Sequence, residues 1–198
     1  GCVAIIFKTK PERRFTAVEA ERAGALLVIG KERAGNVPFL CVDNPYQLFK
    51  RIMSDIRDKY QPIVVAITGT MGKSTTKELT YGAFQQHFNT LCIEGNNNTL
   101  NTSSLIMQKL TASDGAYVQE VHEGSPGSAQ AISELIKPHI CIITAIAEGH
   151  LEQLGTMDNV INEIMSVTYG MDENGLLVLN DDNAYLHEQH PNSRTVRV

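Results

Sequence analysis

Apolar and polar positions follow two different arrangements along the chain, and the change falls near residue 61. Before that point, short apolar runs predict strands, and stretches with apolar positions at helical spacing predict helices. The strands are expected at 3–7, 25–29 and 39–42, and the helices at 15–23 and 45–57. Gln61-Pro62 disfavours helix and opens the second part. We therefore expect a small, partial α/β domain at residues 1–61 and a second domain at 62–198.

In the second part, apolar runs alternate regularly with amphipathic stretches. Strands are expected at 63–68, 90–94, 116–120, 140–145 and 176–179, and helices at 74–88, 99–110, 126–137 and 157–170. Ser125-Pro126 is a typical helix start, with Ser as the cap and Pro in the first turn. Continuous apolar strands separated by helices predict an α/β fold with a mostly parallel sheet covered on both faces. Ligands of such sheets bind at the carboxyl ends of the strands.

The segment after the first of these strands, Thr68-Gly-Thr-Met-Gly-Lys-Ser74, predicts a phosphate-binding loop (P-loop). Its glycines let backbone N–H groups approach a triphosphate, and the following helix directs its positive end at the same anion. Lys73 would contact the β- and γ-phosphates, and the Ser74 hydroxyl would bind Mg²⁺. The sequence thus predicts ATP binding, with Mg²⁺. The predicted nucleotide contacts are Gly69, Thr70, Met71, Gly72, Lys73, Ser74 and Thr75.

Two other interpretations of this loop stay open. A strict phosphate-loop pattern needs Gly at position 67, where this chain has Ile67, so the segment could be a glycine turn that happens to carry a lysine. A P-loop protein that drives motion is a further class, and it would usually show that glycine together with an Asp at the end of a neighbouring strand. The apolar run before the loop and the helical pattern after it favour phosphate binding.

Polar residues follow three other predicted strands. Glu120 could hold Mg²⁺, although a solvated strand-end carboxylate is an equal alternative. His150 could be a metal ligand or could orient a phosphate, whereas a lone His after a strand is more often a surface residue. The Asn-rich segment 95–102 could donate hydrogen bonds to a ligand, although the local sequence favours a turn that feeds a capped helix. His122, two residues after Glu120, could approach the same metal region, although a surface position is favoured.

The composition is that of an ordinary globular protein, with 198 residues, 42% hydrophobic residues and a formal net charge of −5. That charge argues against a general nucleic-acid partner. The apolar N-terminus is too short for a signal peptide or a membrane span, so no membrane partner and a cytoplasmic location are expected. The four cysteines lie far apart, and those at 41, 92 and 141 are expected to be buried, reduced thiols.

Taken together, these segments resemble the Mur ligases. Thr68–Ser74 is similar to the family's ATP loop, Tyr117–Glu120 to its metal-binding strand, and Ile146–Thr156 to its A-H-L-E-x-[FL]-G-[ST] segment. Asn180-Asp-Asp182 is similar to its N-[AD]-D turn. Gly95–Asn98 and residues 15–60 most resemble the members that add D-alanyl-D-alanine to a UDP-N-acetylmuramoyl peptide.

The resemblance implies an ATP-dependent ligase of cell-wall precursor synthesis, in which a carboxylate is activated as an acyl phosphate and then attacked by an amine. It implies catalytic roles for Lys73 and His150, metal binding by Ser74, Glu120 and His150, and a nucleotide contact for Asn180. It also places Asn96 and Asn98 at the substrate, a UDP-linked muramoyl peptide.

The chain departs from the family in two places. The family carries a carbamylated lysine for its second metal near position 164, and no lysine follows Lys137 here. A non-catalytic ATP-binding module is therefore an alternative. The family's N-N-x-I-G after the Asn turn is replaced by Asn98-Thr-Leu-Asn-Thr102, so a ligase for another carboxylate is a further alternative. Relative to the family, the end of the ATP domain and an amine-binding domain would follow Val198, so we expect no full turnover from residues 1–198 alone.

Overall fold

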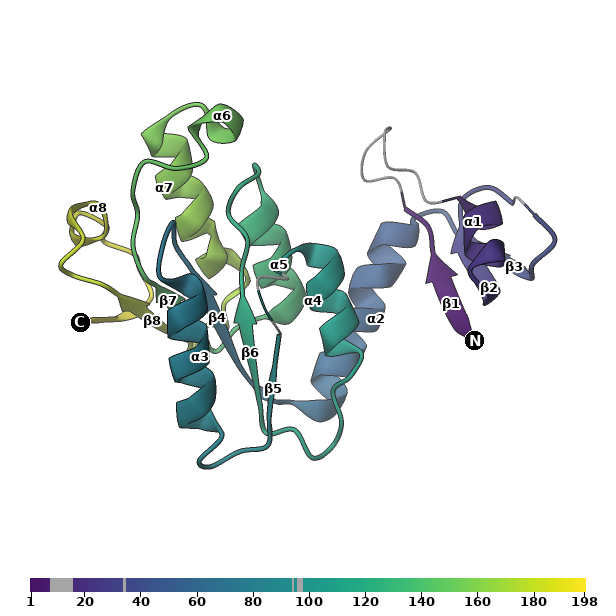
Figure 1. Cartoon of the computed structure of the whole chain (residues 1–198), viewed down its shortest axis with the longest axis horizontal. Coiled ribbons are helices and arrows are strands. Elements are labelled where there is room, and N and C mark those ends of the chain that lie inside the picture. The colour runs from purple at the N-terminus through teal and green to yellow at the C-terminus, as the bar shows by residue number, and fades with distance from the viewer. Residues whose placement is uncertain (8–15, 34, 94, 96–97) are drawn as a thin grey trace. The chain divides into compact units, whose positions relative to one another are not determined.

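The computed structural model describes residues 1–7, 16–33, 35–93, 95 and 98–198. By its internal contacts the chain divides into two compact units, Gly1–Ile52 and Met53–Val198 (Figure 1). The division falls inside the helix α2 (Pro45–Tyr60), whereas the domain boundary expected from the sequence lies at 61/62. This helix continues three residues beyond the predicted end at Arg57, and Gln61 with φ 47° follows it.

The first unit is built on a three-stranded parallel sheet. Its strands lie in the order β1 (Cys2–Ile5), β2 (Ala25–Gly30) and β3 (Phe39–Cys41). The helix α1 (Ala17–Arg22) begins with a capping box in which Thr16 and Glu19 exchange hydrogen bonds. A small core joins these elements. Its buried members are Ala17, Ala20, Ala25, Val28 and Val37.

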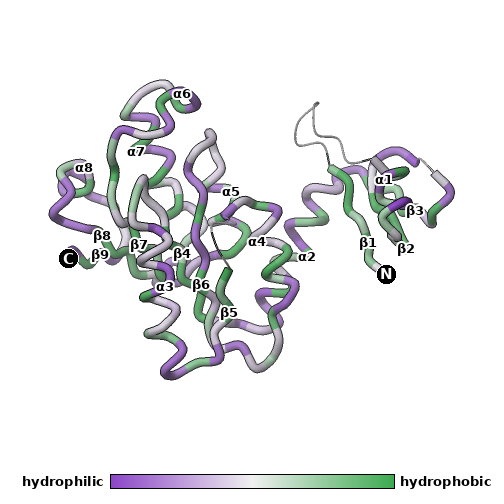
Figure 2. Tube along the Cα trace, in the orientation of Figure 1, coloured by the Kyte–Doolittle hydropathy of each residue, from purple (hydrophilic) through white to green (hydrophobic). Residues whose placement is uncertain are grey.

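The second unit is built on a six-stranded sheet in which every neighbouring pair is parallel, in the order β5-β6-β4-β7-β8-β9. The strands are β4 (Ile63–Thr68), β5 (Thr90–Cys92), β6 (Ala116–Glu120), β7 (Ile140–Ile143), β8 (Leu176–Leu179) and β9 (Arg194–Arg197). The strands β7 and β8 consist only of Ile, Leu, Val and Cys residues, and both are coloured as hydrophobic in Figure 2. The predicted α/β fold with a mostly parallel sheet is therefore confirmed.

Helices cover both faces of this sheet. The helices that follow β4 are α3 (Lys73–Phe84), α4 (Leu100–Met107), α5 (Ser128–Ile136), α6 (Leu151–Leu154), α7 (Met157–Met165), the 3₁₀ helix η2 (Ser166–Gly170) and α8 (Ala184–His187). Val65, Ile67 and Val118 form a core cluster against which Phe84 of α3 packs. On the opposite face, the Cys141 thiol lies 3.6 Å from the Val167 carbonyl of η2. The central strands are thereby buried on both faces, as their continuous apolar sequence predicts.

Several local predictions were wrong. The helix expected at 126–137 begins at Ser128, after Gly127 with φ 74°, so Ser125 is not its cap. The helix expected at 157–170 changes to 3₁₀ geometry at Ser166. The sequence reading missed α6, α8 and β9, all of four residues. Within the described residues, no helix has both the length and the apolar character needed to cross a bilayer.

Candidate functional site

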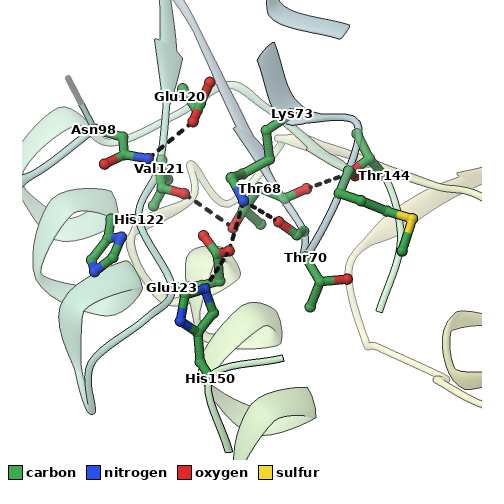
Figure 3. A network of polar contacts seen from close by, with 12 residues as sticks. Thr68, Thr70, Lys73, Asn98, Glu120, Val121, His122, Glu123, Thr144 and His150 are labelled. Carbon is green, nitrogen blue, oxygen red and sulfur yellow. Dashed lines mark hydrogen bonds and ion pairs between the residues drawn. The ribbon is translucent and has the colours of Figure 1, made fainter. Parts of the chain in front are cut away.

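The loop between β4 and α3 is fixed against the end of β7. The Thr70 N–H donates to the Ala145 carbonyl at 2.9 Å. The Thr144 hydroxyl lies 3.1 Å from the Thr68 carbonyl and 2.6 Å from the Met71 carbonyl (Figure 3). The segment therefore joins a strand to a helix at the carboxyl edge of the sheet, which is the structural context that the phosphate-loop prediction requires.

Glycine is required in this loop for two separate reasons. Gly69 has φ 133° and Gly72 has φ 84°, both in the region that L residues avoid. A Cβ on Gly69 would also lie 2.4 Å from the Thr144 Oγ1 and 2.8 Å from the Ala145 carbonyl. The loop can therefore approach β7 this closely only with glycine at position 69.

Lys73, the first residue of α3, makes two short contacts. Its Nζ donates to the Gly69 carbonyl at 2.6 Å and to the Glu123 Oε1 at 2.7 Å (Figure 3). The Glu123 side chain is only 1% exposed, and its Oε2 has no hydrogen-bond partner. The loop lysine is thus held by a buried carboxylate that the sequence analysis did not single out, although it follows Glu120 by only three residues.

Glu120, at the end of β6, lies on the other side of the helix start. The Ser74 hydroxyl donates to its Oε2 at 2.8 Å, and the Asn98 amide donates to its Oε1 at 2.9 Å. Glu120 is 1% exposed, so the solvated alternative for this carboxylate is wrong. Asn98 contacts Glu120 in this structure, and its role toward a substrate stays a prediction. Asn96 lies outside the described residues.

His150 lies beside Glu123, at the start of α6. Its Nε2 is 3.6 Å from the Glu123 Oε1, and the side chain is 40% exposed. The ring centroid of His122 lies 6.2 Å from that of His150, in an edge-on arrangement. His122 is half-buried, so the surface placement expected for it is wrong in part. The two imidazoles and the Glu123 carboxylate therefore line one side of the site.

Asn180 supports the loop from behind. Its amide donates to the Thr144 carbonyl at 2.9 Å, and its Oδ1 accepts the Asp182 N–H at 3.1 Å. Asn180 follows β8, the strand next to β7, so these bonds fix the residue that holds the loop. Its predicted contact with a nucleotide stays a prediction, as do those of Thr75 and the exposed Met71.

Two further polar residues that the sequence analysis missed shape the surroundings. Lys77, one turn after Lys73, is 1% exposed and donates to the Ile93 and Gly95 carbonyls at 2.9 and 2.8 Å. Glu163 of α7 accepts the Gly127 N–H at 2.6 Å and the Ala129 N–H at 2.8 Å, and so caps α5 from another helix. Both sets of contacts join residues far apart in the sequence, so no local pattern indicated them.

The oxygen atoms at this edge of the sheet are chemically suited to bind Mg²⁺. They are carboxylate and hydroxyl oxygens, which are the hard ligands that this ion prefers. The Glu123 Oε2 accepts no hydrogen bond from a described residue, so its lone pairs are available to a cation. Among the described residues, no three His, Cys, Asp or Glu side chains converge as a complete metal site.

Comparison with known proteins places this geometry in a family. The family model described as the Mur ligase middle domain matches residues 67–198. A curated relative from Escherichia coli (strain K12), named UDP-N-acetylmuramoyl-tripeptide–D-alanyl-D-alanine ligase, is 29% identical over 189 residues. The match covers 92% of this chain and 41% of the relative. The chain thus spans about two fifths of the length of the curated relatives it matches.

Solved structures give the same fold. A structure of MurF from Acinetobacter baumannii matches with a TM-score of 0.82 at 18% identity. The match covers 98% of this chain and 44% of the MurF chain. A structure of the MurF ligase from Thermotoga maritima in complex with ADP has a TM-score of 0.80 at 23% identity, covering 91% of this chain and 43% of its own. At these identities the likeness concerns the fold.

Proposed function

The chain belongs to the Mur ligase family, and we propose that the protein that carries it is an ATP-dependent ligase joining a carboxylate to an amine. The observation that supports this most is the match of the middle-domain model to residues 67–198, which include the loop, Lys73, Ser74, Glu120 and His150. The relatives named above are ligases, and one fold neighbour was solved with ADP. The proposed chemistry is phosphorylation of the carboxylate to an acyl phosphate, followed by attack of the amine.

The residues of this chain would act on the phosphates by position and charge. The loop amides and Lys73 would bind the β- and γ-phosphates and stabilise the charge that develops during phosphoryl transfer. Ser74 and Glu120 would hold Mg²⁺, which supplies further charge neutralisation on the same oxygens. His150 would lie near the acyl phosphate, on the side of the site that Glu123 lines. Asn180 would keep the loop in place through Thr144.

The proposed substrates follow the names of the relatives. They are a UDP-N-acetylmuramoyl tripeptide as the carboxylate and D-alanyl-D-alanine as the amine, in the synthesis of cell-wall precursors. Asn96 and Asn98 are proposed to contact the carboxylate substrate. The altered segment at 98–102 makes a different carboxylate the alternative to test beside it.

A coupled assay on the full-length protein tests this proposal. We expect ADP and phosphate to appear only when both substrates and Mg²⁺ are present, together with a product whose mass equals the two substrates less one water. Lys73→Ala should abolish ADP release because the loop loses its cation. Absence of ADP release from the wild type with this substrate pair and with alternative carboxylates would contradict the proposal.

A non-catalytic nucleotide-binding module is the second candidate, and one observation favours it. Near position 164, where the resemblance to the family implies a metal-holding lysine, this chain has a fully buried Ile164, and no lysine follows Lys137. Crystals soaked with ADP, Mg²⁺ and a phosphate mimic separate the two candidates. Two bound metal ions would support the ligase, whereas one or none would support the binding module.

A further inference from the structure

Glu123 carries an oxygen atom that lacks a partner. Its Oε1 binds Lys73, but its Oε2 is buried and accepts no hydrogen bond from any described residue. A buried carboxylate oxygen without a donor costs free energy, because water solvated it in the unfolded chain. In native proteins such an atom calls for an explanation, and a bound ion or water, a catalytic role and local strain are the usual ones.

The charges around the loop indicate what binds. Glu120 and Glu123 are both 1% exposed, and among the described residues Lys73 is the one lysine or arginine paired with either of them, while the His150 imidazole lies 3.6 Å from the Glu123 Oε1. The hydrogen bonds of Glu120 come from the neutral groups of Ser74 and Asn98. Two carboxylates and one ammonium leave an excess negative charge where a polyanion is proposed to bind. The site therefore needs additional positive charge when phosphates enter.

We propose that Glu123 is a second carboxylate ligand for the divalent cation that enters with the nucleotide, an inference that rests on the proposed function. When phosphates bind Lys73, its ammonium turns from the Glu123 Oε1, and both oxygens of Glu123 become available to the cation. His150, whose Nε2 lies 3.6 Å from the same oxygen, stands on the same side (Figure 3). Mg²⁺ held by one or two carboxylates and by substrate phosphates needs no complete protein cage.

The competing explanation is that Glu123 is only a structural counter-ion that positions Lys73. The two explanations differ in how they couple nucleotide to metal. A mere counter-ion opposes phosphate binding equally with and without metal. A carboxylate that binds the cation weakens the binding of metal-free nucleotide but strengthens the binding of nucleotide with metal. Its removal therefore lowers the ratio of the nucleotide affinity with metal to the affinity without metal.

Binding measurements on the full-length protein separate these explanations. The non-hydrolysable ATP analogue AMP-PNP is titrated in EDTA and in MnCl₂, and bound Mn²⁺ is counted by electron paramagnetic resonance. The variants are Glu123→Gln, Glu123→Asp and, as the matched control, Glu173→Gln, an exposed residue outside the site. Circular dichroism of each variant establishes that it is folded. If Glu123→Gln does not fold, Glu123→Asp, which keeps the carboxylate on a shorter side chain, can still be compared with the wild type.

We expect Glu123→Gln to bind AMP-PNP more tightly in EDTA and to bind Mn²⁺ at least about tenfold more weakly in the presence of AMP-PNP. Glu123→Asp should retain part of the Mn²⁺ affinity, and Glu173→Gln should match the wild type. Equal gains in AMP-PNP affinity with and without Mn²⁺, with unchanged Mn²⁺ binding, would overturn the inference alone. A wild type that binds no AMP-PNP under either condition would overturn the proposed function and this inference with it.

Discussion

Ser74 donates a hydrogen bond of 2.8 Å to Glu120, although the two residues lie 46 positions apart in the sequence. The bond joins the first turn of α3 to the end of β6, the two elements that carry the proposed metal ligands. Because β6 and β4 are neighbours in the sheet, the parallel pairing of Ile67 with Glu120 places this carboxylate level with the start of the loop. The register of the sheet thus places the Glu120 carboxylate within reach of the Ser74 hydroxyl.

Replacing Ser74 by Ala should weaken the binding of nucleotide with Mg²⁺ by about tenfold, because it removes a hydroxyl ligand and one hydrogen bond of Glu120. Ser74→Thr retains the hydroxyl and should stay within about threefold of the wild type. Isothermal calorimetry with ADP and Mg²⁺ measures both. An unchanged affinity in Ser74→Ala would contradict the proposed role.

Gly69→Ala should abolish the loop conformation. The new Cβ would lie 2.4 Å from the Thr144 Oγ1, and φ at this residue is 133°, so the loop must move away from β7. We expect nucleotide affinity to fall at least about a hundredfold, equivalent to about 3 kcal/mol, since a residue in such a region is strained by about that amount. Fluorescence titration with a labelled ATP measures the loss.

Gly82→Ala is the matched control for that substitution. Gly82 lies inside α3, and a Cβ there would meet nothing within 4 Å. Alanine favours helix over glycine, so this variant should be more stable by about 0.5–1 kcal/mol and should bind nucleotide normally. Equal losses of affinity in the two variants would show that the effect of Gly69→Ala is not local.

Lys77→Met should destabilise the second unit by about 2–4 kcal/mol, because it leaves the Ile93 and Gly95 carbonyls without their buried donor. Glu78→Gln is the control. The Glu78 carboxylate lies 3.0 Å from the same ammonium but is 65% exposed, and such exposed pairs contribute at most about 1 kcal/mol. Urea unfolding followed by circular dichroism compares them, and similar midpoints for both variants would be the contrary outcome.

Glu163→Ala should destabilise the protein by about 1–3 kcal/mol, because the first N–H groups of α5 lose their acceptor. Glu163→Gln keeps one acceptor oxygen and should lose less. Thermal unfolding measures both, with the exposed Glu173→Gln as a reference that should not shift. A Glu163→Ala protein as stable as the wild type would mean that water replaces the carboxylate at no cost.

Thiol reactivity should separate the four cysteines by pH. Burial raises the pKa of Cys141 to about 12 and that of Cys92 to about 11, whereas Cys2 and Cys41 are exposed. Only the thiolate reacts with iodoacetamide, so Cys141 should be almost unreactive at pH 8. Mass spectrometry should find Cys2 and Cys41 modified first, with reaction at Cys92 rising as the pH rises. Early modification of Cys141 would contradict its burial.

The strands that the sequence predicted well are those buried on both faces. An apolar run such as 176–179 has one explanation in an α/β chain, and β8 has those bounds. The edge strand β9 has the sequence Arg-Thr-Val-Arg and is half exposed, so no apolar run marked it. Cys41 shows the reverse error, because its apolar neighbourhood predicted burial and the residue is exposed.

The parts of the site that the sequence could not give depend on contacts between distant residues. The loop motif is local, so its residues were readable from their order. The partner of Lys73, however, lies 50 positions away, and the carboxylate that caps α5 lies 34 to 36 positions away on α7. The wrong start predicted for α5 has the same cause, since local capping residues at 125–126 gave way to a cap supplied by another helix.

The hydroxyl of Thr144 has one more consequence. Because it fastens the glycine turn to the neighbouring strand through the Thr68 and Met71 carbonyls, the turn is already rigid when the nucleotide arrives. The entropy of ordering this segment is then lost during folding and not during binding, which is the meaning of a pre-organised receptor. Nucleotide affinity in this chain should therefore depend on the hydrogen bonds between the turn and Thr144, as well as on the groups that contact phosphate.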